Sequence, residues 1–300
     1  MPGKDTTVIL PLPADFDRET FLDFHRRDTQ SVAEKIDAAC LQKAFIWQHQ
    51  PALLSVDFAR AGHVQLVLRL DGSASPASKL LESLGRHLLG LDQPTREFEE
   101  QVGSHPLVGA MVRRQAGLRV PQSASPFEAL SWAIIGQQIS VAAAVSIRRR
   151  FIQTFGRRHS GGLYCYPDAT DVLQTDAQAL TACGFSRSKA DCLLTVARAC
   201  VSDSLLPEFS TPPPRLETLQ KALLKIRGLG PWSVHYALLR GYAWMDGSLH
   251  GDVAVRRAIQ QLQGQSSPPT ARDTEAWLAE FHPWRSLLAA HLWKSLSVNA

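Results

Sequence analysis

The sequence has no run of apolar residues long enough to span a membrane, and Met1 to Leu12 do not have the layout of a signal peptide. It contains only five cysteines, an odd number, and no two of them form a CxxC pair. This usage argues against a disulfide framework and is typical of thiols in a reducing compartment. We therefore expect a soluble protein of the cytoplasm that has no membrane partner.

The chain as a whole has only a small net charge, but its acidic and basic residues are unevenly distributed along the sequence. The net charge is +4, yet residues 1–105 have 11 Lys and Arg against 15 Asp and Glu, and residues 106–300 have the remaining 21 against 13. The net charge is therefore −4 over residues 1–105 and +8 over residues 106–300. Such a division suits a polyanion that binds one side of the molecule. Arginines scattered over solvated helices would give the same counts, so both interpretations stay open.

The N-terminal part predicts an α+β domain. Short apolar runs bounded by turn residues predict strands, and two longer periodic runs predict helices. The expected strands are Thr6–Leu12, Phe45–Trp47, Leu53–Phe58 and Val64–Leu70, and the expected helices are Arg18–Arg27 and Lys79–Leu91. Because 300 residues exceed what one small core usually holds, we expect further domains after this one.

From Glu97 onward the apolar residues recur at helical spacing. A long helical segment is expected over residues 127–155, with an interruption at residues 136–138. Two helical segments are expected around Gly184. The C-terminal helices are expected at Thr274–Phe281 and Trp284–Leu296, and a proline-rich connection is expected at Pro207–Pro214. This part of the chain is therefore expected to be helical.

The most informative stretch runs from Leu223 to Ile259. A short helix leads into Gly228, the next residues are Leu-Gly-Pro, and a second helix follows to Tyr242. A glycine hairpin at a helix N-terminus points backbone N–H groups outward and suits a phosphate. A plain turn between two packed helices has the same sequence pattern. Further on, Asp252 directly precedes an apolar-periodic run, where an aspartate is by default an N-cap.

Together these residues carry a resemblance to a known family. The motif reads Leu-x-x-Ile-x-Gly-Leu-Gly-Pro-Trp-Ser-Val-His-Tyr-Ala-Leu-Leu-Arg-Gly, with Gly-Asp twenty residues beyond the tryptophan. Three more stretches occur in family order: 125–140, 283–286 and 291–293. The sequence over 106–300 resembles the helix-hairpin-helix (HhH-GPD) superfamily of DNA glycosylases. It is most similar to the 3-methyladenine DNA glycosylase II (AlkA-type) branch.

The resemblance implies a mainly α fold with an N-terminal α+β domain that contains an antiparallel sheet. The implied domains are 1–102, a helical domain 127–244 that ends in the hairpin, and a second helical domain of 103–126 plus 245–300. The active-site cleft lies between the two helical domains, and Asp252 belongs to the second. The implied partner is double-stranded DNA containing damaged bases, and a nucleoid-associated monomer is expected.

The implied activity is removal of a flipped-out alkylated purine, of the 3-methyladenine and 7-methylguanine class, by water, leaving an abasic site. Bifunctional relatives have a lysine nucleophile eighteen or nineteen residues before the acid, where this sequence has Val234 and Ser233. The nearest upstream lysine, Lys225, lies on the other helix, so a monofunctional enzyme is expected. Two alternatives stay open: a glycosylase for deaminated or oxidised bases, and a catalytically idle DNA-binding module.

By position in the family motifs, Asp252 is the catalytic acid, which would stabilise positive charge on the sugar. The backbone around Gly228, Leu229 and Gly230 would bind phosphate. Gln138 matches the intercalating residue, although some relatives have leucine there. Capping of the following helix is the alternative role for Gln138.

The resemblance assigns the base pocket to aromatic side chains. Trp232 and Tyr236 are four residues apart on one helical face, and Trp293 matches a pocket tryptophan. Phe24 aligns with an N-terminal pocket aromatic. Stacking on such rings favours a cationic purine by about 0.5–2 kcal/mol. The alternative is that the three C-terminal rings are core residues, and Lys294 stands where some relatives have tyrosine.

No organic cofactor is expected. Relatives bind a monovalent cation, Na⁺ or K⁺, through hairpin carbonyls that correspond to Leu224, Ile226 and Leu229. Some relatives carry an iron–sulfur cluster. Because no cysteine follows Cys200, we expect none here.

Overall fold

The N-terminal strands form a sheet because apolar residues alternate along them. In β5 (His63–Leu70) every second residue, from Val64 to Leu70, is buried. The computed structural model describes residues 5–72, 77–207 and 215–297. The other strands are β1 (Thr6–Pro11), β2 (Glu34–Asp37), β3 (Cys40–Trp47) and β4 (Gln50–Asp57). All neighbours are antiparallel, in the order β1-β5-β4-β3-β2. The antiparallel sheet is confirmed.

The expected strand list was incomplete. It omitted β2 and began β3 at Phe45, whereas β3 begins at Cys40. The reason is that Glu34 and Lys43 lie opposite each other across β2 and β3 and are both buried. Charged residues on the inner face hide the alternation of apolar and polar residues by which strands are recognised.

Two helices accompany the sheet, as expected. They are α1 (Arg18–His25) and α2 (Ser78–Leu89). Asp17 is the N-cap of α1 and accepts a hydrogen bond from the Thr20 amide at 3.0 Å. Helix α2 places its buried leucines against the sheet, in the apolar cluster of this domain.

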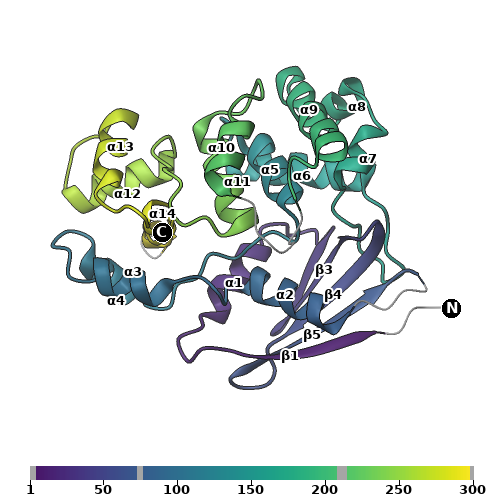
Figure 1. Ribbon diagram of the computed structural model, residues 1–300, viewed down its shortest axis with the longest axis horizontal. Coiled ribbons are helices and arrows are strands. Elements are labelled where there is room, and N and C mark those ends of the chain that lie inside the picture. Colours follow the sequence, from purple (N-terminus) through teal and green to yellow (C-terminus); the bar gives the residue numbers. More distant parts are fainter. Residues whose placement is uncertain (1–4, 73–76, 208–214, 298–300) are drawn as a thin grey trace.

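The remainder of the described chain is helical (Figure 1). Its helices are α3 (Thr95–Val102), α4 (Gly109–Arg114), α5 (Pro126–Gly136), α6 (Val141–Phe155), α7 (Ala169–Leu173), α8 (Ala177–Ala182), α9 (Arg187–Asp203), α10 (Leu216–Leu223), α11 (Pro231–Tyr242), α12 (Val253–Gln263), α13 (Ala271–Ala279) and α14 (Arg285–Ser297). The interruption at 136–138 is confirmed. The segment around Gly184 contains three helices rather than two, because Asp168 and Asp176 each cap a short one. Residues 208–214 of the proline-rich connection lie outside the described residues.

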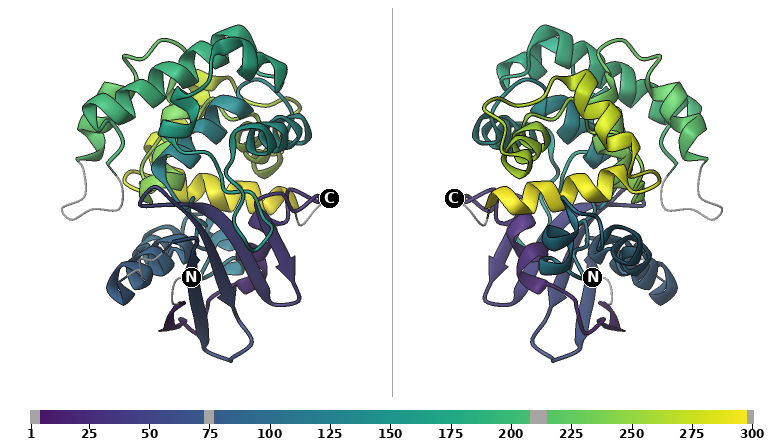
Figure 2. Two further views of the ribbon diagram at one scale, coloured as in Figure 1. Left: turned by 90° about the vertical axis from the view of Figure 1, so that its right-hand side faces the viewer. Right: turned by 90° about the vertical axis from the view of Figure 1, so that its left-hand side faces the viewer.

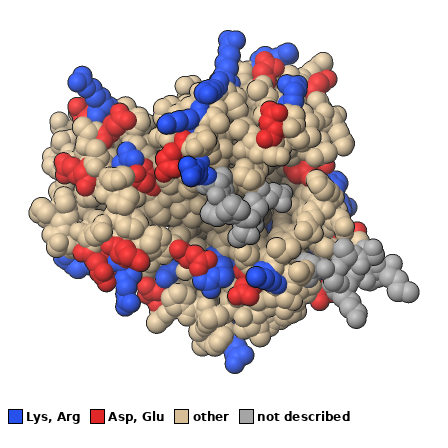
Figure 3. All heavy atoms as spheres, in the orientation of Figure 1, with Lys and Arg blue, Asp and Glu red and all other residues tan. Residues whose placement is uncertain are grey.

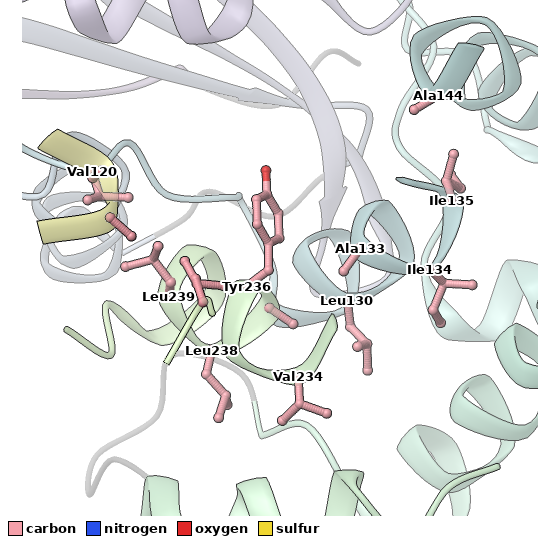
Figure 4. Close-up of a cluster of buried hydrophobic side chains, with 14 of the residues drawn as sticks. Val120, Leu130, Ala133, Ile134, Ile135, Ala144, Val234, Tyr236, Leu238 and Leu239 are labelled. Carbon is pink, nitrogen blue, oxygen red and sulfur yellow. The ribbon is translucent and has the colours of Figure 1, made fainter. Parts of the chain in front are cut away.

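One continuous apolar cluster fills the helical part. Helices α5 and α11 pack against each other at its centre, and Figure 4 shows their apolar side chains. Helix α14, yellow in Figure 2, packs against α12 and α4. Because residues of both expected helical domains share this cluster, the division at residue 245 stays a prediction. In the described ranges no helix is long and apolar enough to cross a membrane.

A buried ionic network joins the sheet to the helices. Lys43 Nζ donates to Glu34 at 2.6 Å and to Glu128 of α5 at 2.7 Å. Arg148 of α6 contacts the same two carboxylates. Burial by itself would raise the pKa of Glu34, but Lys43 and Arg148 hold that pKa well below its usual value. Removing one partner would leave an unpaired buried charge, so the network fixes how the two parts pack.

Candidate active site

The expected hairpin lies between α10 and α11. Gly228 has φ +97°, and a Cβ added there would lie 3.0 Å from the Cβ of Cys192 on α9. Gly230, the N-cap of α11, has φ −99°, and an added Cβ would meet no atom of the chain within 4 Å. The turn therefore requires glycine at 228 for its own backbone. At 230 the structure gives no such reason, and the space in front of that residue is open.

Not all of the three hairpin amides that were expected to bind phosphate are free to do so. The Leu229 N–H donates to the Ile226 carbonyl at 3.1 Å, and the Leu229 side chain is buried in the core. Leu229 is therefore not a phosphate donor. Within the described residues the amides of Gly228 and Gly230 have no hydrogen-bond partner, and they are the groups that can bind an anion at the N-terminus of α11.

The loop between α5 and α6 carries the expected wedge residue. Gln138 is exposed and has φ +55°. Its alternative role as a cap is wrong, because the Ser140 hydroxyl caps α6 by accepting from the Ala143 amide at 3.3 Å. Gln138 therefore has no role within the helix that follows, and its side chain lies at the surface.

Two residues that the sequence did not single out individually hold this loop. Gln137 Nε2 donates to the Gly228 carbonyl at 2.9 Å and to Ser233 Oγ at 2.8 Å. Lys189 Nζ donates to the Ile135 carbonyl at 2.9 Å and to the Gln137 carbonyl at 2.8 Å. The wedge loop and the hairpin are thus bonded to each other. Lys189 lies in the first turn of α9, and nothing in its local sequence indicates this contact.

Asp252 is the N-cap that its sequence position predicts, and its carboxylate also contacts the two expected tryptophans. As the N-cap of α12, its Oδ1 accepts from the Ala254 and Val255 amides at 2.9 and 3.0 Å. The Trp232 indole N–H donates to Oδ2 at 2.8 Å, and the Trp293 indole N–H donates to Oδ1 at 3.2 Å. Three helices therefore meet at one half-buried carboxylate, which the expected pocket tryptophans hold directly.

The expected aromatic side chains lie together. The rings of Trp232 and Tyr236 stack with centroids 5.4 Å apart, and those of Tyr236 and Trp293 are 6.1 Å apart. The two tryptophans are half-buried and Tyr236 is buried, so the rings also pack against the core. Figure 4 shows the Tyr236 ring directed away from the apolar Val234 and Leu238. Its hydroxyl accepts from the Trp132 indole N–H at 3.0 Å.

A cavity of about 40 Å³ adjoins Tyr236, room for roughly three water molecules. Its walls include Phe24, Tyr236, Trp132 and the arginines Arg27 and Arg240. The N-terminal domain thus contributes Phe24 beside the rings of α11, as the resemblance implied. A purine is larger than this space, so its entry requires side chains at the mouth to move. A second cavity, of about 420 Å³ near Arg157, shares no lining residue with the Asp252 contacts.

Two neighbouring charged residues are structural. Lys294 does not face the rings; its Nζ donates to Asp17 at 2.6 Å and to Thr20 at 2.8 Å, which joins α14 to α1. Burial by itself would raise the pKa of Asp17, but the hydrogen bonds from Lys294 and Thr20 lower it to about 2. Asp246 is engaged by Arg285 and His282. The Asp246 carboxylate is therefore occupied by contacts within the fold.

The positions for a lysine nucleophile hold no amine. Val234 is buried in the core, and Ser233 is buried and bonded to Gln137. Lys225 is exposed beyond the end of α10.

On the face in Figure 3, basic and acidic side chains are interspersed rather than segregated. That face therefore shows no single-sign patch for a polyanion.

The sequence matches two protein-family models and a known glycosylase. The model of the HhH-GPD superfamily of base excision DNA repair proteins matches residues 131–283, and that of the AlkA N-terminal domain matches residues 7–125. The chain belongs to the HhH-GPD superfamily. The DNA-3-methyladenine glycosylase 2 of Escherichia coli K12 is 32% identical over 208 residues, covering 68% of this chain and 70% of that protein.

Solved structures of 3-methyladenine DNA glycosylases have a similar fold. The 3-methyladenine DNA-glycosylase of Archaeoglobus fulgidus superposes with a TM-score of 0.81 at 18% identity, over 95% of this chain and 97% of that one. The Schizosaccharomyces pombe 3-methyladenine DNA glycosylase, in complex with abasic DNA, has a TM-score of 0.57 at 25% identity. That match covers 66% of this chain and 95% of the other. The expected fold and family are confirmed.

Proposed function

We propose that this HhH-GPD protein is a monofunctional DNA glycosylase that removes alkylated purines from double-stranded DNA with water as the nucleophile. The observation that carries the proposal is the Asp252 carboxylate, held by two indole N–H groups beside the aromatic cluster. The relatives are named as 3-methyladenine DNA glycosylases, which supports alkylated purines as the substrate class. An idle DNA-binding module would not need a carboxylate built into its aromatic cluster.

The proposed role of Asp252 is electrostatic. Breaking the bond between base and sugar develops positive charge on the deoxyribose, and a fixed carboxylate in a partly dry site stabilises that charge. A carboxylate has about four acceptor sites, and Asp252 already receives four hydrogen bonds. A group so engaged is suited to acting through its charge rather than to forming a bond with the sugar. Water is then the nucleophile, since positions 233 and 234 offer no amine.

The proposed DNA contacts are the amides of Gly228 and Gly230 with phosphate, and Gln138 in the gap that the flipped base leaves. The bonds of Gln137 and Lys189 keep these two elements at a fixed separation. The S. pombe relative was solved with abasic DNA, which supports this class of partner. We also propose that the protein works as a monomer at the nucleoid, without an organic cofactor.

A monovalent cation is proposed at the hairpin, held by the carbonyls of Leu224, Ile226 and Leu229. Leu224 follows the last residue of α10, where outward carbonyls and the negative end of the helix dipole favour a cation. Carbonyl oxygens are the ligands that hard cations prefer. When bound, the cation would add positive charge beside a DNA phosphate.

The decisive experiment compares the Asp252→Asn variant with the wild type. We expect release of 3-methyladenine and 7-methylguanine from methylated duplex DNA, followed by chromatography, to fall at least about 100-fold, which corresponds to about 2.7 kcal/mol of lost transition-state stabilisation. Binding to a duplex with an abasic-site analogue should stay close to that of the wild type. Excision at the wild-type rate by the variant would refute the assignment of Asp252.

A further inference from the structure

The cavity beside Tyr236 is lined in part by Ser123, whose hydroxyl has no partner in the described chain. Ser123 is 7% exposed, and in the described ranges no hydrogen bond joins its hydroxyl to another residue. Buried polar groups almost always have a partner, because an unpaired one loses its bonds to water without replacement. A buried and unpartnered hydroxyl at the wall of a binding cavity therefore indicates a group that is available to a ligand.

The segment that carries Ser123 is fixed through its backbone. The Pro121 carbonyl accepts from Arg240 Nη1 at 2.8 Å, and the Ser123 N–H donates to the Arg240 carbonyl at 2.8 Å. The Ala124 N–H donates to Glu128 Oε2 at 3.0 Å. These bonds hold the chain on both sides of the Ser123 side chain. The position of the hydroxyl is therefore set before a base arrives, which lowers the entropy cost of binding.

The other polar side chains on the cavity wall are already bonded or are charged. The Trp132 indole N–H donates to the Tyr236 hydroxyl at 3.0 Å. Each acid on the wall is paired with a cation of the fold, and these acids are Asp28, Glu34 and Glu128. The guanidiniums on the wall can donate hydrogen bonds but cannot accept them, and they belong to Arg27, Arg148 and Arg240. The Ser123 hydroxyl can do both.

The two lesions of the proposed substrate class differ at a place where a hydroxyl suits both. Methylation at N3 of adenine or at N7 of guanine leaves position 6 of the purine unmodified. At that position adenine has an amino group, which donates, and guanine has a carbonyl oxygen, which accepts. A hydroxyl has one donor and two acceptor lone pairs, so it can accept from the amino group or donate to the carbonyl. A group that could only donate or only accept would suit one lesion and reject the other.

We propose that the Ser123 hydroxyl hydrogen-bonds position 6 of the flipped-out purine, accepting from 3-methyladenine and donating to 7-methylguanine. This contact rests on the proposed glycosylase function and names a recognition residue within the same pocket. Ser123 holds the base in place, whereas Asp252 keeps its proposed role at the deoxyribose. Before a base enters, the cavity has room for water that the hydroxyl can bond, and the base then replaces that water.

The test compares two free bases that differ only in the group at position 6. Free 3-methyladenine and free 3-methylpurine, which lacks the amino group, are used to inhibit 7-methylguanine release from methylated duplex DNA. We expect the wild type to bind 3-methyladenine about fivefold more tightly than 3-methylpurine, which is the discrimination that one neutral hydrogen bond gives. In Ser123→Ala the two inhibition constants should be equal. The matched control is Ser131→Ala, which removes a buried hydroxyl that bonds Tyr166 at 2.7 Å outside the cavity lining, and its ratio of inhibition constants should equal that of the wild type.

The outcomes separate this proposal from the proposed function. The same ratio of inhibition constants in the wild type and in Ser123→Ala would overturn the proposal and leave the glycosylase function standing. Because the Ser123 hydroxyl has no partner to lose in the described chain, Ser123→Ala should unfold at the urea concentration of the wild type or above it. A clear loss of stability would show that the hydroxyl bonds within the fold, and would also overturn the proposal. Release of neither 3-methyladenine nor 7-methylguanine from methylated DNA by the wild type would overturn the glycosylase function and this proposal with it.

Discussion

The two hairpin glycines provide a matched pair of substitutions that separates folding from DNA contact. At Gly228, φ is +97°, and an added methyl group would lie 3.0 and 3.1 Å from the Cβ and Sγ of Cys192. Such a backbone conformation costs a non-glycine residue about 1–3 kcal/mol, before the contact with Cys192 is counted. We therefore expect Gly228→Ala to lower the free energy of unfolding by about 2 kcal/mol or more.

At Gly230 the same methyl group meets open space, and φ is −99°, which any residue adopts. Replacing an N-cap glycine by alanine should cost less than about 1 kcal/mol of stability. If a phosphate approaches the amides here, however, the methyl group lies in its path. Gly230→Ala should then unfold at nearly the wild-type urea concentration but bind an abasic-site duplex at least about tenfold more weakly.

The assays for this pair are urea unfolding followed by tryptophan fluorescence, and anisotropy of a labelled duplex. Wild-type affinity of Gly230→Ala at a salt concentration where binding depends on phosphate contacts would refute the reasoning. It would mean that the space in front of the hairpin is simply solvent. A large loss of stability in Gly230→Ala would contradict the geometry of the turn itself.

Two further predictions concern other contacts of the site. Trp232→Phe keeps a ring against Tyr236 but removes the indole N–H that donates to Asp252. Because a hydrogen bond to a charged group is worth about 1.5–3 kcal/mol, the single-turnover rate of base excision should fall about tenfold or more. Trp47→Phe, which removes an indole N–H without a partner in the described chain, is the control, and equal rates in both variants would contradict the role of Trp232. Lys294→Met should destabilise the protein at pH 7 because it frees Asp17. The folded-state pKa of Asp17, about 2, is below its unfolded value of about 3.9, so the difference from the wild type in urea titrations should shrink as the pH falls from about 4 to 2. A difference that stays constant over this range would show that Lys294 acts through packing.

The contacts of Asp252 show what a linear pattern can predict. Asp252, the glycine hairpin and the two tryptophans could be predicted from the sequence because each belongs to a short motif, and these motifs occur in a fixed order along the chain. Their mutual arrangement could not be found that way, since the Trp293 indole reaches Asp252 across 41 residues of chain. An N-cap and a catalytic carboxylate also have the same sequence pattern, and only the two indole donors distinguish the site from an ordinary helix start.

Charged residues were the least predictable part. Glu34 and Lys43 have the appearance of surface residues in the sequence, yet both are buried, and their pairing with Glu128 and Arg148 defines the junction of the two parts. The same holds for Arg240, which the motif shows only as a basic residue near the end of a helix. A charge is buried only when partners from distant segments compensate it, so its location is a property of the fold rather than of local sequence.

This difference explains why the substrate is harder to infer than the reaction. The reaction needs one carboxylate and a turn, which local motifs encode. Which base the pocket accepts depends on the side chains that line it, and these come from distant segments: Phe24 of α1, Trp132 of α5 and Tyr236 of α11. The lining of this pocket is therefore the part of the site that was assembled by folding.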